Sequence, residues 1–223
     1  MNFIYELFGK LLYGVYVVVK NYGLSIVLFT IIIKIILLPL TLKQTNSMKK
    51  MQEIQPKLEE LQKKYKHNKE ALNQKMMDLY REHNYNPAGG CLPLLIQFPI
   101  LIGLFRVLQN PQTYVFPAGT YENVVQSFLW LPSLGQPDPF YILPILTVIS
   151  TYLSTKMISA RSGGGTQQQT QKTMNLIMPL FIGYISMSFP SGLALYWVVS
   201  NLFQMGQQYV ALRNVGVNKE ASR

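Results

Sequence analysis

The segment Tyr22–Leu42, with the sequence YGLSIVLFTIIIKIILLPLTL, decides the fold class of this chain. Its residues are mostly apolar, and Lys34 is its one charged side chain. A bilayer core about 30 Å thick is crossed by roughly 20 apolar residues in a helix. The segment therefore predicts a transmembrane helix, and we expect other parts of the chain to be embedded in a membrane as well.

Four more apolar blocks follow the first, and hydrophobic residues make up 49% of the chain. The blocks lie at 91–108, 140–158, 174–189 and 193–212. The last two are separated by Phe189-Pro190-Ser191-Gly192, in which proline and glycine favour a tight turn between helices. The sequence thus predicts an all-α integral membrane protein with five transmembrane helices, the first of them at 22–42.

The distribution of Lys and Arg predicts the orientation of these helices. Ten basic residues lie within 43–86, whereas the connection 109–139 has none. Because cytoplasmic loops carry an excess of Lys and Arg, the segment 43–86 and the basic tail 213–223 are predicted to be cytoplasmic. The N-terminal end of the chain is then outside and the C-terminal end inside. This topology accounts for the formal net charge of +10, so we expect no specific nucleic-acid binding.

Two segments outside the predicted spans have helical periodicity. In 1–21 the apolar residues fall on one side, which predicts an interfacial amphipathic helix on the outer surface. In 43–86 two narrow apolar stripes flank His67-Asn68, which predicts a cytoplasmic helical hairpin. The stripes of this hairpin either bury each other or offer methionine-rich surface to a partner or to lipid.

The polar residues within the spans exclude several kinds of chemistry. No acidic residue lies in any of the five spans, and both histidines lie in 43–86. Proton-coupled transporters use intramembrane carboxylates or histidines, and a Ser-His protease needs a histidine as its base. The spans also lack a Cys, His, Asp or Glu cluster with metal-ligand spacing. We therefore expect no catalytic residue, no metal and no cofactor.

Lys34 is the exception that points to a function. It lies about eight residues before Leu42, which is roughly 12 Å of helical rise below the cytoplasmic end of the span. Its side chain either snorkels to the interface without a function or faces a wet cavity. The cavity is favoured, because helical side chains lean towards the N-terminus, which for this span is away from the nearer surface. The polar residues that could line such a cavity are Thr30, Gln97, Ser200, Asn201 and Gln204. None of them is a carboxylate, so we expect Lys34 to attract an anionic or polar group that a partner brings.

Several stretches of the chain match a known pattern in the correct order. These are YGLSI at 22–26, LPLT at 38–41, GGCLPLLIQFPI at 89–100, YILPIL at 141–146 and FPSGLALYWVVSN at 189–201. With them the chain resembles the YidC family of membrane protein insertases, which is related to the mitochondrial Oxa and chloroplast Albino proteins. The resemblance extends over nearly the whole chain, from Gly23 to Arg213.

The resemblance implies a mechanism and a set of site residues. Five core helices of this family enclose a hydrophilic groove that is closed on the outside, open to the cytoplasm and to lipid, and receives polar segments of a substrate. Lys34 falls where the family usually has arginine, and lysine lacks the planar fork of that side chain. Positions that the family associates with the groove or with substrate contact are occupied by Thr30, Gln97, Phe98, Leu101, Trp197 and Ser200. For three of these residues, Phe98, Leu101 and Trp197, ordinary helix packing is an equally good explanation.

The resemblance also implies partners and a location. The substrates would be nascent membrane proteins, and the hairpin and tail would contact the Sec translocon, the ribosome and membrane lipid. The location would be the bacterial cytoplasmic membrane, and the lack of a large periplasmic domain would mark a short form. A channel or transporter is the main alternative function. A structural assembly factor, which stabilises helices without moving them, is the second alternative.

Overall fold

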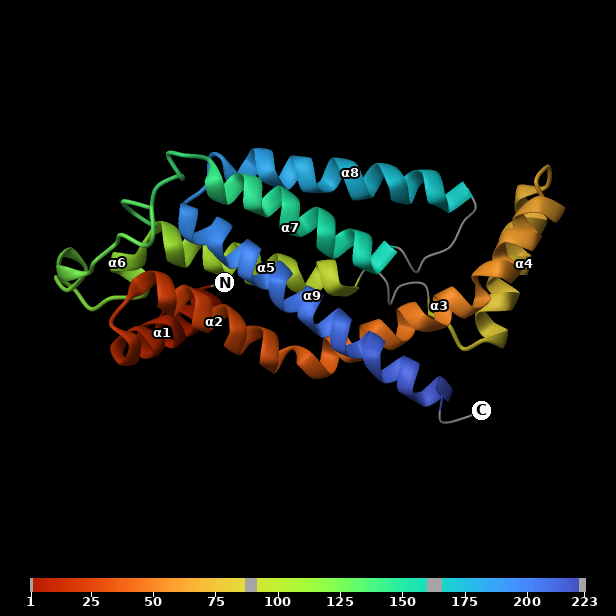
Figure 1. Cartoon of the computed structure of the whole chain (residues 1–223), viewed down its shortest axis with the longest axis horizontal. Coiled ribbons are helices and arrows are strands. Elements are labelled where there is room, and N and C mark those ends of the chain that lie inside the picture. The colour runs from red at the N-terminus through yellow and green to blue at the C-terminus, as the bar shows by residue number, and fades with distance from the viewer. Residues whose placement is uncertain (1, 87–91, 160–165, 221–223) are drawn as a thin grey trace.

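A computed structural model describes residues 2–86, 92–159 and 166–220 of the chain (Figure 1). Its elements are α1 (Asn2–Val19), α2 (Tyr22–Ile36), α3 (Leu38–Lys64), α4 (Lys69–Glu82), α5 (Leu92–Gln109), α6 (Pro111–Tyr114), the 3₁₀ turn η2 (Tyr121–Asn123), α7 (Ile142–Ser159), α8 (Thr166–Ser186) and α9 (Ser191–Glu220). In these residues the one extended pairing is an isolated bridge between Phe128 and Leu131. The predicted all-helical class is confirmed.

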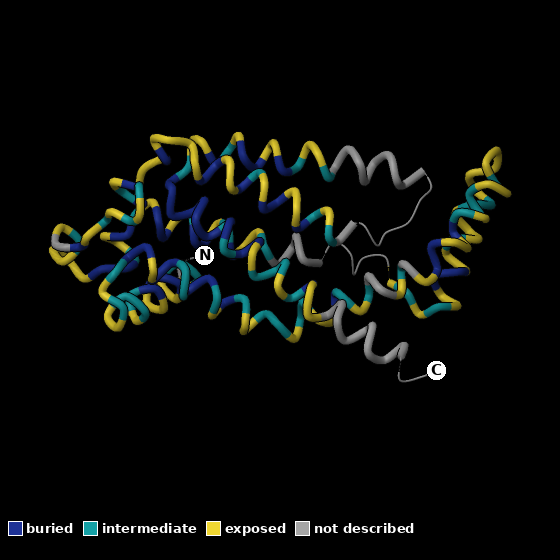
Figure 2. The backbone as a smooth tube through the Cα atoms, viewed as in Figure 1, coloured by how far each residue is buried: buried dark blue, intermediate teal, exposed yellow. Residues whose placement is uncertain are grey.

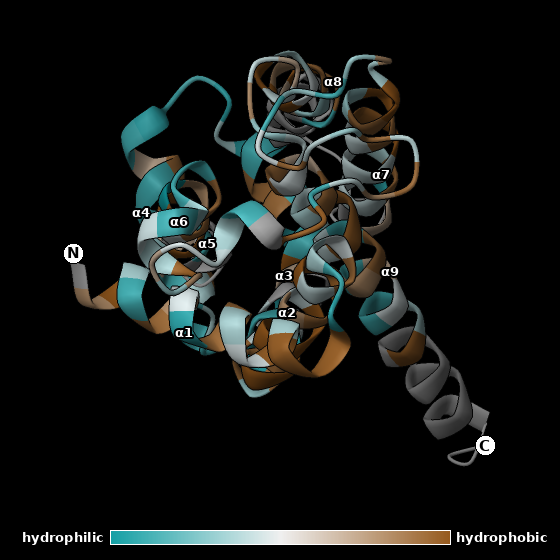
Figure 3. Cartoon of the chain, turned by 90° about the vertical axis from the view of Figure 1, so that its left-hand side faces the viewer, coloured by the Kyte–Doolittle hydropathy of each residue, from teal (hydrophilic) through white to brown (hydrophobic). Residues whose placement is uncertain are grey.

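The long helices lie along one axis and form a bundle (Figure 1). α9 packs against α7 and α2, α7 packs against α8, and α1 contacts both α2 and α5. Figure 3, viewed along this axis, separates the α7–α8 pair from the side that holds α1, α2 and α5. We call the end that carries α6 and the connection 110–141 the loop end. The opposite end, where α3 and α4 project, is the hairpin end.

The first predicted span is not one straight helix. α2 ends at Ile36, α3 begins at Leu38, and the two are bent by 58°. Pro39 lies in the first turn of α3, where its missing N–H is tolerated, but inside a continuous helix its ring would clash with the carbonyl of Ile35. The prediction of an unbroken helix over 22–42 is therefore wrong, because its last turns belong to the hairpin helix α3.

Length and composition set a limit on what each helix can do alone. Among the described residues no single helix is long and apolar enough to cross a bilayer. The bent pair Tyr22–Ile36 and Leu38–Ser47, taken together, has the length and composition to do so. Shorter apolar helices run over Gln97–Gln109, Ile142–Met157 and Asn175–Ser186. α8 begins before the predicted block at 174, and α9 continues into the predicted tail as far as Glu220.

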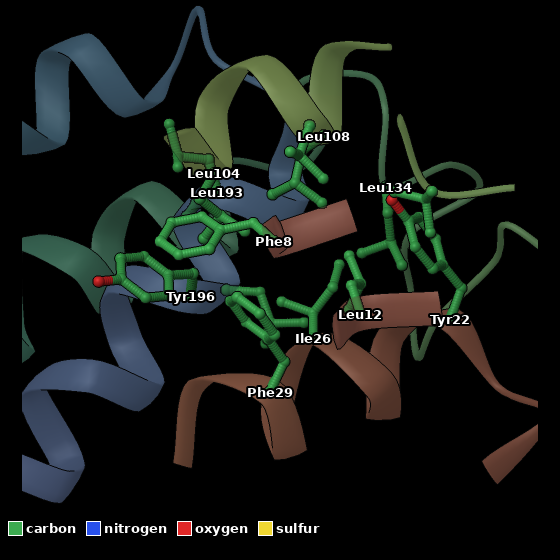
Figure 4. Close-up of a cluster of buried hydrophobic side chains, with 14 of the residues drawn as sticks. Phe8, Leu12, Tyr22, Ile26, Phe29, Leu104, Leu108, Leu134, Leu193 and Tyr196 are labelled. Carbon is green, nitrogen blue, oxygen red and sulfur yellow. The ribbon is translucent and has the colours of Figure 1, made fainter. Parts of the chain in front are cut away.

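The main hydrophobic core lies towards the loop end, where buried residues are concentrated (Figure 2). Its largest fully buried side chains come from α1, α2, α5, α9 and the connection 110–141: Leu12, Tyr22, Ile26, Phe29, Leu104, Val107, Leu108, Leu131, Leu134 and Tyr196. Figure 4 labels most of these side chains and shows them converging from several helices. Close packing of these side chains stabilises the fold through many small van der Waals contacts.

α1 contributes to this core with one face. Phe8 and Leu12 are buried, whereas Phe3 and Val18, which point away from them, are 75% and 82% exposed. Gly9 allows this packing, because a Cβ at this position would collide with the backbone carbonyl of Tyr114. The apolar side predicted for an interfacial helix is thus divided: Phe8 and Leu12 pack in the core between α2 and α5, and the rest of this side is more exposed.

The connection at the loop end holds the start of α9. The first N–H groups of a helix have no partner within it. Here the Ser191 N–H donates to the Gln136 carbonyl over 2.8 Å, and the Gly192 N–H donates to the Leu134 carbonyl over 2.9 Å. The Ser191 hydroxyl donates to the Ser133 carbonyl over 3.0 Å. The connection therefore fixes the position of α9.

The hairpin end has a small core of its own. Ile54 and Leu58 on α3 are buried with Leu79 and Tyr80 on α4. The turn ends at Asn68, whose side chain accepts a hydrogen bond from the Ala71 N–H and caps α4. The two apolar stripes seen in the sequence face each other in this structure.

Candidate functional site

Lys34 lies on the inward side of α2, one turn after Thr30 and two turns after Ile26. Ile26 and Thr30 are fully buried, and the Thr30 hydroxyl donates to the Ile26 carbonyl over 2.6 Å. Residues four apart on a helix share a face, so Lys34 continues this buried line as a half-buried side chain. No described residue forms a hydrogen bond or ion pair with Lys34.

The register between the first helices and α9 is defined by two contacts. Near the loop end, a Cβ at Gly192 would meet the Ile26 side chain at 3.2 Å. Near the hairpin end, the Gln207 side-chain amide donates to the Thr41 hydroxyl over 3.2 Å. In both contacts the residue numbers differ by 166, so α9 runs parallel to α2 and the start of α3. Residues with this separation lie at about the same level of the bundle.

This register places Ser200 at the level of Lys34, and Tyr196 at the level of Thr30. α5 joins them at this level, because the Gln97 side-chain amide donates to the Tyr196 hydroxyl over 2.7 Å. Ser200 is buried and within reach of the same hydroxyl. We call Thr30, Lys34, Gln97, Tyr196 and Ser200 the polar strip. Three helices thus place a cation, an amide and three hydroxyl groups at about the same level of the bundle.

Tyr196 is the member of the polar strip that the sequence analysis missed. This residue is 1% exposed, which is typical of a packing residue. The signal that could have found it is its spacing, since it lies one turn before Ser200 on α9. Gln204 lies one turn after Ser200 and is half-buried.

Asn201 does not belong to the polar strip. Its side-chain amide donates to the Ser150 hydroxyl over 3.1 Å and to the Thr151 hydroxyl over 2.9 Å. Both hydroxyls are on α7, on the side of α9 away from α2. Asn201 therefore joins α9 to α7, and the structure does not bring it together with Lys34.

We expect Asn201→Leu to lower the free energy of unfolding by about 1 kcal/mol. It removes two interhelical hydrogen bonds, and such bonds each contribute a fraction of a kcal/mol or slightly more to the stability of membrane proteins. The measurement is the unfolding of purified protein in mixed detergent. Gln204→Leu, half-buried on the same helix, is the matched control and should have a smaller effect. Equal effects from the two variants would contradict the assigned role of Asn201.

α7 also carries a polar face that the sequence analysis did not single out. Thr147, Ser150, Thr151 and Ser154 are each at most 5% exposed and recur at helical spacing. The Thr147 hydroxyl has no hydrogen-bond partner among the described residues. Among all the residues that the structure describes, no group of three or more His, Cys, Asp or Glu residues could hold a metal ion.

The three residues with an expected contact role differ in their surroundings. Leu101 on α5 packs against the main core. Phe98, one turn earlier on the same helix, is 51% exposed. Trp197 on α9 is half-buried and follows Tyr196 directly. Of the three, Phe98 is the most accessible to a partner.

Known proteins resemble this chain over most of its length. Residues 14–219 match the family described as 60Kd inner membrane protein. The chain is similar to the membrane protein insertase YidC of Caldanaerobacter subterraneus subsp. tengcongensis, with 42% identity over 96% of this chain and 96% of the relative. It is also similar to the protein of the same name from Clostridium perfringens, with 49% identity over 85% of this chain and 77% of the relative. The protein of that name from Fusobacterium nucleatum is 47% identical over 87% of this chain and 88% of the relative.

One solved structure has a similar fold. It is a crystal structure of an active YidC insertase with its first transmembrane domain resolved, and it aligns with a TM-score of 0.72 at 29% sequence identity. The alignment covers 93% of this chain and 46% of that chain. The folded core therefore has a counterpart of known structure, and this chain spans about half of that longer protein.

Proposed function

Because this chain belongs to the YidC family of membrane protein insertases, we propose that it inserts nascent membrane proteins into the bacterial cytoplasmic membrane by receiving their polar segments on the polar strip. One observation carries this proposal. Lys34 is half-buried, lies at the level of Ser200 and has no partner among the described residues. A cation in such surroundings needs water or an incoming anion.

The proposed mechanism lowers the barrier for polar groups. Moving a polar tail across hydrocarbon is costly, because lipid offers its N–H and C=O groups no hydrogen-bond partners. The hydroxyls and amide of the polar strip supply such partners, and Lys34 attracts acidic residues of the tail. The apolar segment of the substrate then moves sideways along α2 and α9 into lipid.

In the proposed topology, α2 with the start of α3, α5, α7, α8 and α9 are embedded in the membrane. The loop end is outside and the hairpin end is in the cytoplasm. Exposed apolar residues on α7 and α8 support an embedded location: Ile145, Leu146, Ile149, Leu153, Leu176, Ile177, Leu180 and Phe181. α5 and α7 have 18 residues each, so they rise by about 27 Å and favour a locally thinned bilayer.

The α3–α4 hairpin is the proposed contact for the Sec translocon and the ribosome. Its tip carries the exposed basic residues Lys63, Lys64, Lys66 and Lys69. Its apolar stripes are buried between its two helices, so the surface it offers is the charged one. Such a surface suits acidic partners and anionic lipid.

Reconstitution with one small substrate tests the proposal. Liposomes containing the purified chain should protect the tail of a single-span, acid-tailed substrate from added protease, whereas empty liposomes should not. Equal protection in both would overturn the proposed function. Ion flux without protection would instead favour a channel. Insertion that needs no chain, followed by failed folding of the substrate, would favour an assembly factor.

A further inference from the structure

The polar strip ends at a sharp boundary inside the bundle. The Tyr196 hydroxyl accepts the hydrogen bond from Gln97. Figure 4 shows the Tyr196 ring beside Phe8 and Phe29, with its hydroxyl pointing away from these rings. The polar side of Tyr196 therefore belongs to the polar strip, and its ring belongs to the apolar core.

α1 supplies the central residue of the apolar side. Phe8 packs edge-on against Phe29 of α2, with ring centroids 5.7 Å apart at 73°. On its other side, a Cβ at Gly103 of α5 would come within 2.9 Å of the Phe8 ring. Phe8 thus fills the space between α2 and α5. Leu12, one turn towards the loop end, is fully buried in the same cluster (Figure 4).

We propose that α1 is the outer seal of the polar strip: Phe8 and Leu12 pack with Phe29 and Tyr196 and separate the strip from the outer side. This rests on the proposed function, because a seal is needed only if the strip is hydrated from the cytoplasm. Water and ions that reach Lys34 meet a close-packed apolar layer, which offers them no hydrogen-bond partners. The seal lets the strip hold polar groups of a substrate while the membrane stays impermeable to water and ions.

The two faces of α1 allow a matched comparison. Truncating a buried side chain leaves a cavity that its neighbours fill only partly. Phe8 is 8% exposed and Phe3 is 75% exposed, although both are phenylalanines on one helix. Phe8→Ala should open the seal, whereas Phe3→Ala should not.

The experiment measures how fast a thiol in the polar strip reacts with a membrane-impermeant maleimide added outside intact cells. Ser200→Cys is introduced after Cys91, the single cysteine of the chain, is replaced by serine. With native α1 this thiol should be protected. With Phe8→Ala and Leu12→Ala together it should label about tenfold faster, since a local opening exposes it. Phe3→Ala should leave the protection unchanged. Phe8→Leu, made in place of Phe8→Ala, should keep most of the protection.

Two markers and a parallel assay separate the possible failures. Leu129→Cys should label from outside, and Lys63→Cys should label only after the cells are permeabilised; the opposite pattern would overturn the proposed topology. Tail protection in liposomes is measured with the same variants. If insertion proceeds but Ser200→Cys stays protected in the double variant, the seal is overturned while the proposed function stands. If the double variant does not accumulate, Phe8→Ala alone is used, and unchanged protection there overturns the seal equally.

Discussion

Lys34→Ala is expected to slow the insertion of a single-span substrate with an acidic tail by about ten- to a hundredfold. A hydrogen bond to a charged group contributes about 1.5–3 kcal/mol, and each 1.4 kcal/mol changes a rate by about tenfold. Lys34 supplies the one charge of α2, at the level where Gln97, Tyr196 and Ser200 meet. The measurement is the rate of tail protection in liposomes that contain equal amounts of each variant.

Two comparisons show whether the charge of Lys34 is responsible. Lys34→Arg keeps the charge and should insert the substrate at close to the unmodified rate, and Lys10→Ala, on an exposed position of α1, should have no effect. A substrate whose acidic tail residues are replaced by their amides should lose most of its sensitivity to Lys34→Ala, because the two changes act on one interaction. Insertion of the acid-tailed substrate at an unchanged rate in Lys34→Ala would rule out the charge model, although the fold would stand.

Asp138→Ala is expected to lower the free energy of unfolding by about 2–4 kcal/mol, because it leaves one buried and two part-buried donors without their charged acceptor. Asp138 is 2% exposed in the connection at the loop end. Its carboxylate accepts hydrogen bonds from the Leu143 N–H over 2.7 Å, the Phe140 N–H over 3.0 Å and the Trp130 indole N–H over 3.3 Å. These bonds fix the start of α7, against which α8 and α9 pack. Thermal unfolding in detergent measures the loss.

The control is Glu122→Ala, the other acidic residue of the same connection. Glu122 is exposed, so its removal should change the midpoint of thermal unfolding by much less than that of Asp138. Asp138→Asn keeps the shape and one acceptor oxygen but loses the charge, and should fall between the two. A midpoint for Asp138→Ala equal to that of Glu122→Ala would show that these hydrogen bonds do not stabilise the loop end.

Local patterns predicted the elements that depend on neighbouring residues. The two apolar stripes of 43–86 pointed to a helical hairpin, and Ile54, Leu58, Leu79 and Tyr80 form its core. The break at Leu37 could also have been seen, because Pro39 limits the helix before it, but the apolar run across 22–42 masked that signal. Helical periodicity is a property of the chain itself, which is why such elements can be found without a structure.

The partners of each polar residue could not be predicted in this way. Asn201 and Ser200 are adjacent in the sequence, yet one bonds to α7 and the other lies near Gln97 and Tyr196. Neighbouring residues on a helix point about 100° apart, so their surroundings depend on which helices pack on each side. A list of polar residues within spans therefore could not separate the residue that bonds to α7 from those near Gln97 and Tyr196.

The sequence by itself determined the all-helical class, the depth of Lys34 in an apolar segment and the absence of a carboxylate to pair with it in the predicted spans. These follow from composition and from the geometry of a single helix. Only the tertiary structure decided that α9 brings Ser200 to the level of Lys34, and that Phe8 of α1 fills the space between α2 and α5. Both depend on contacts between segments far apart in the chain, where close packing of whole side chains, rather than local periodicity, selects the neighbours.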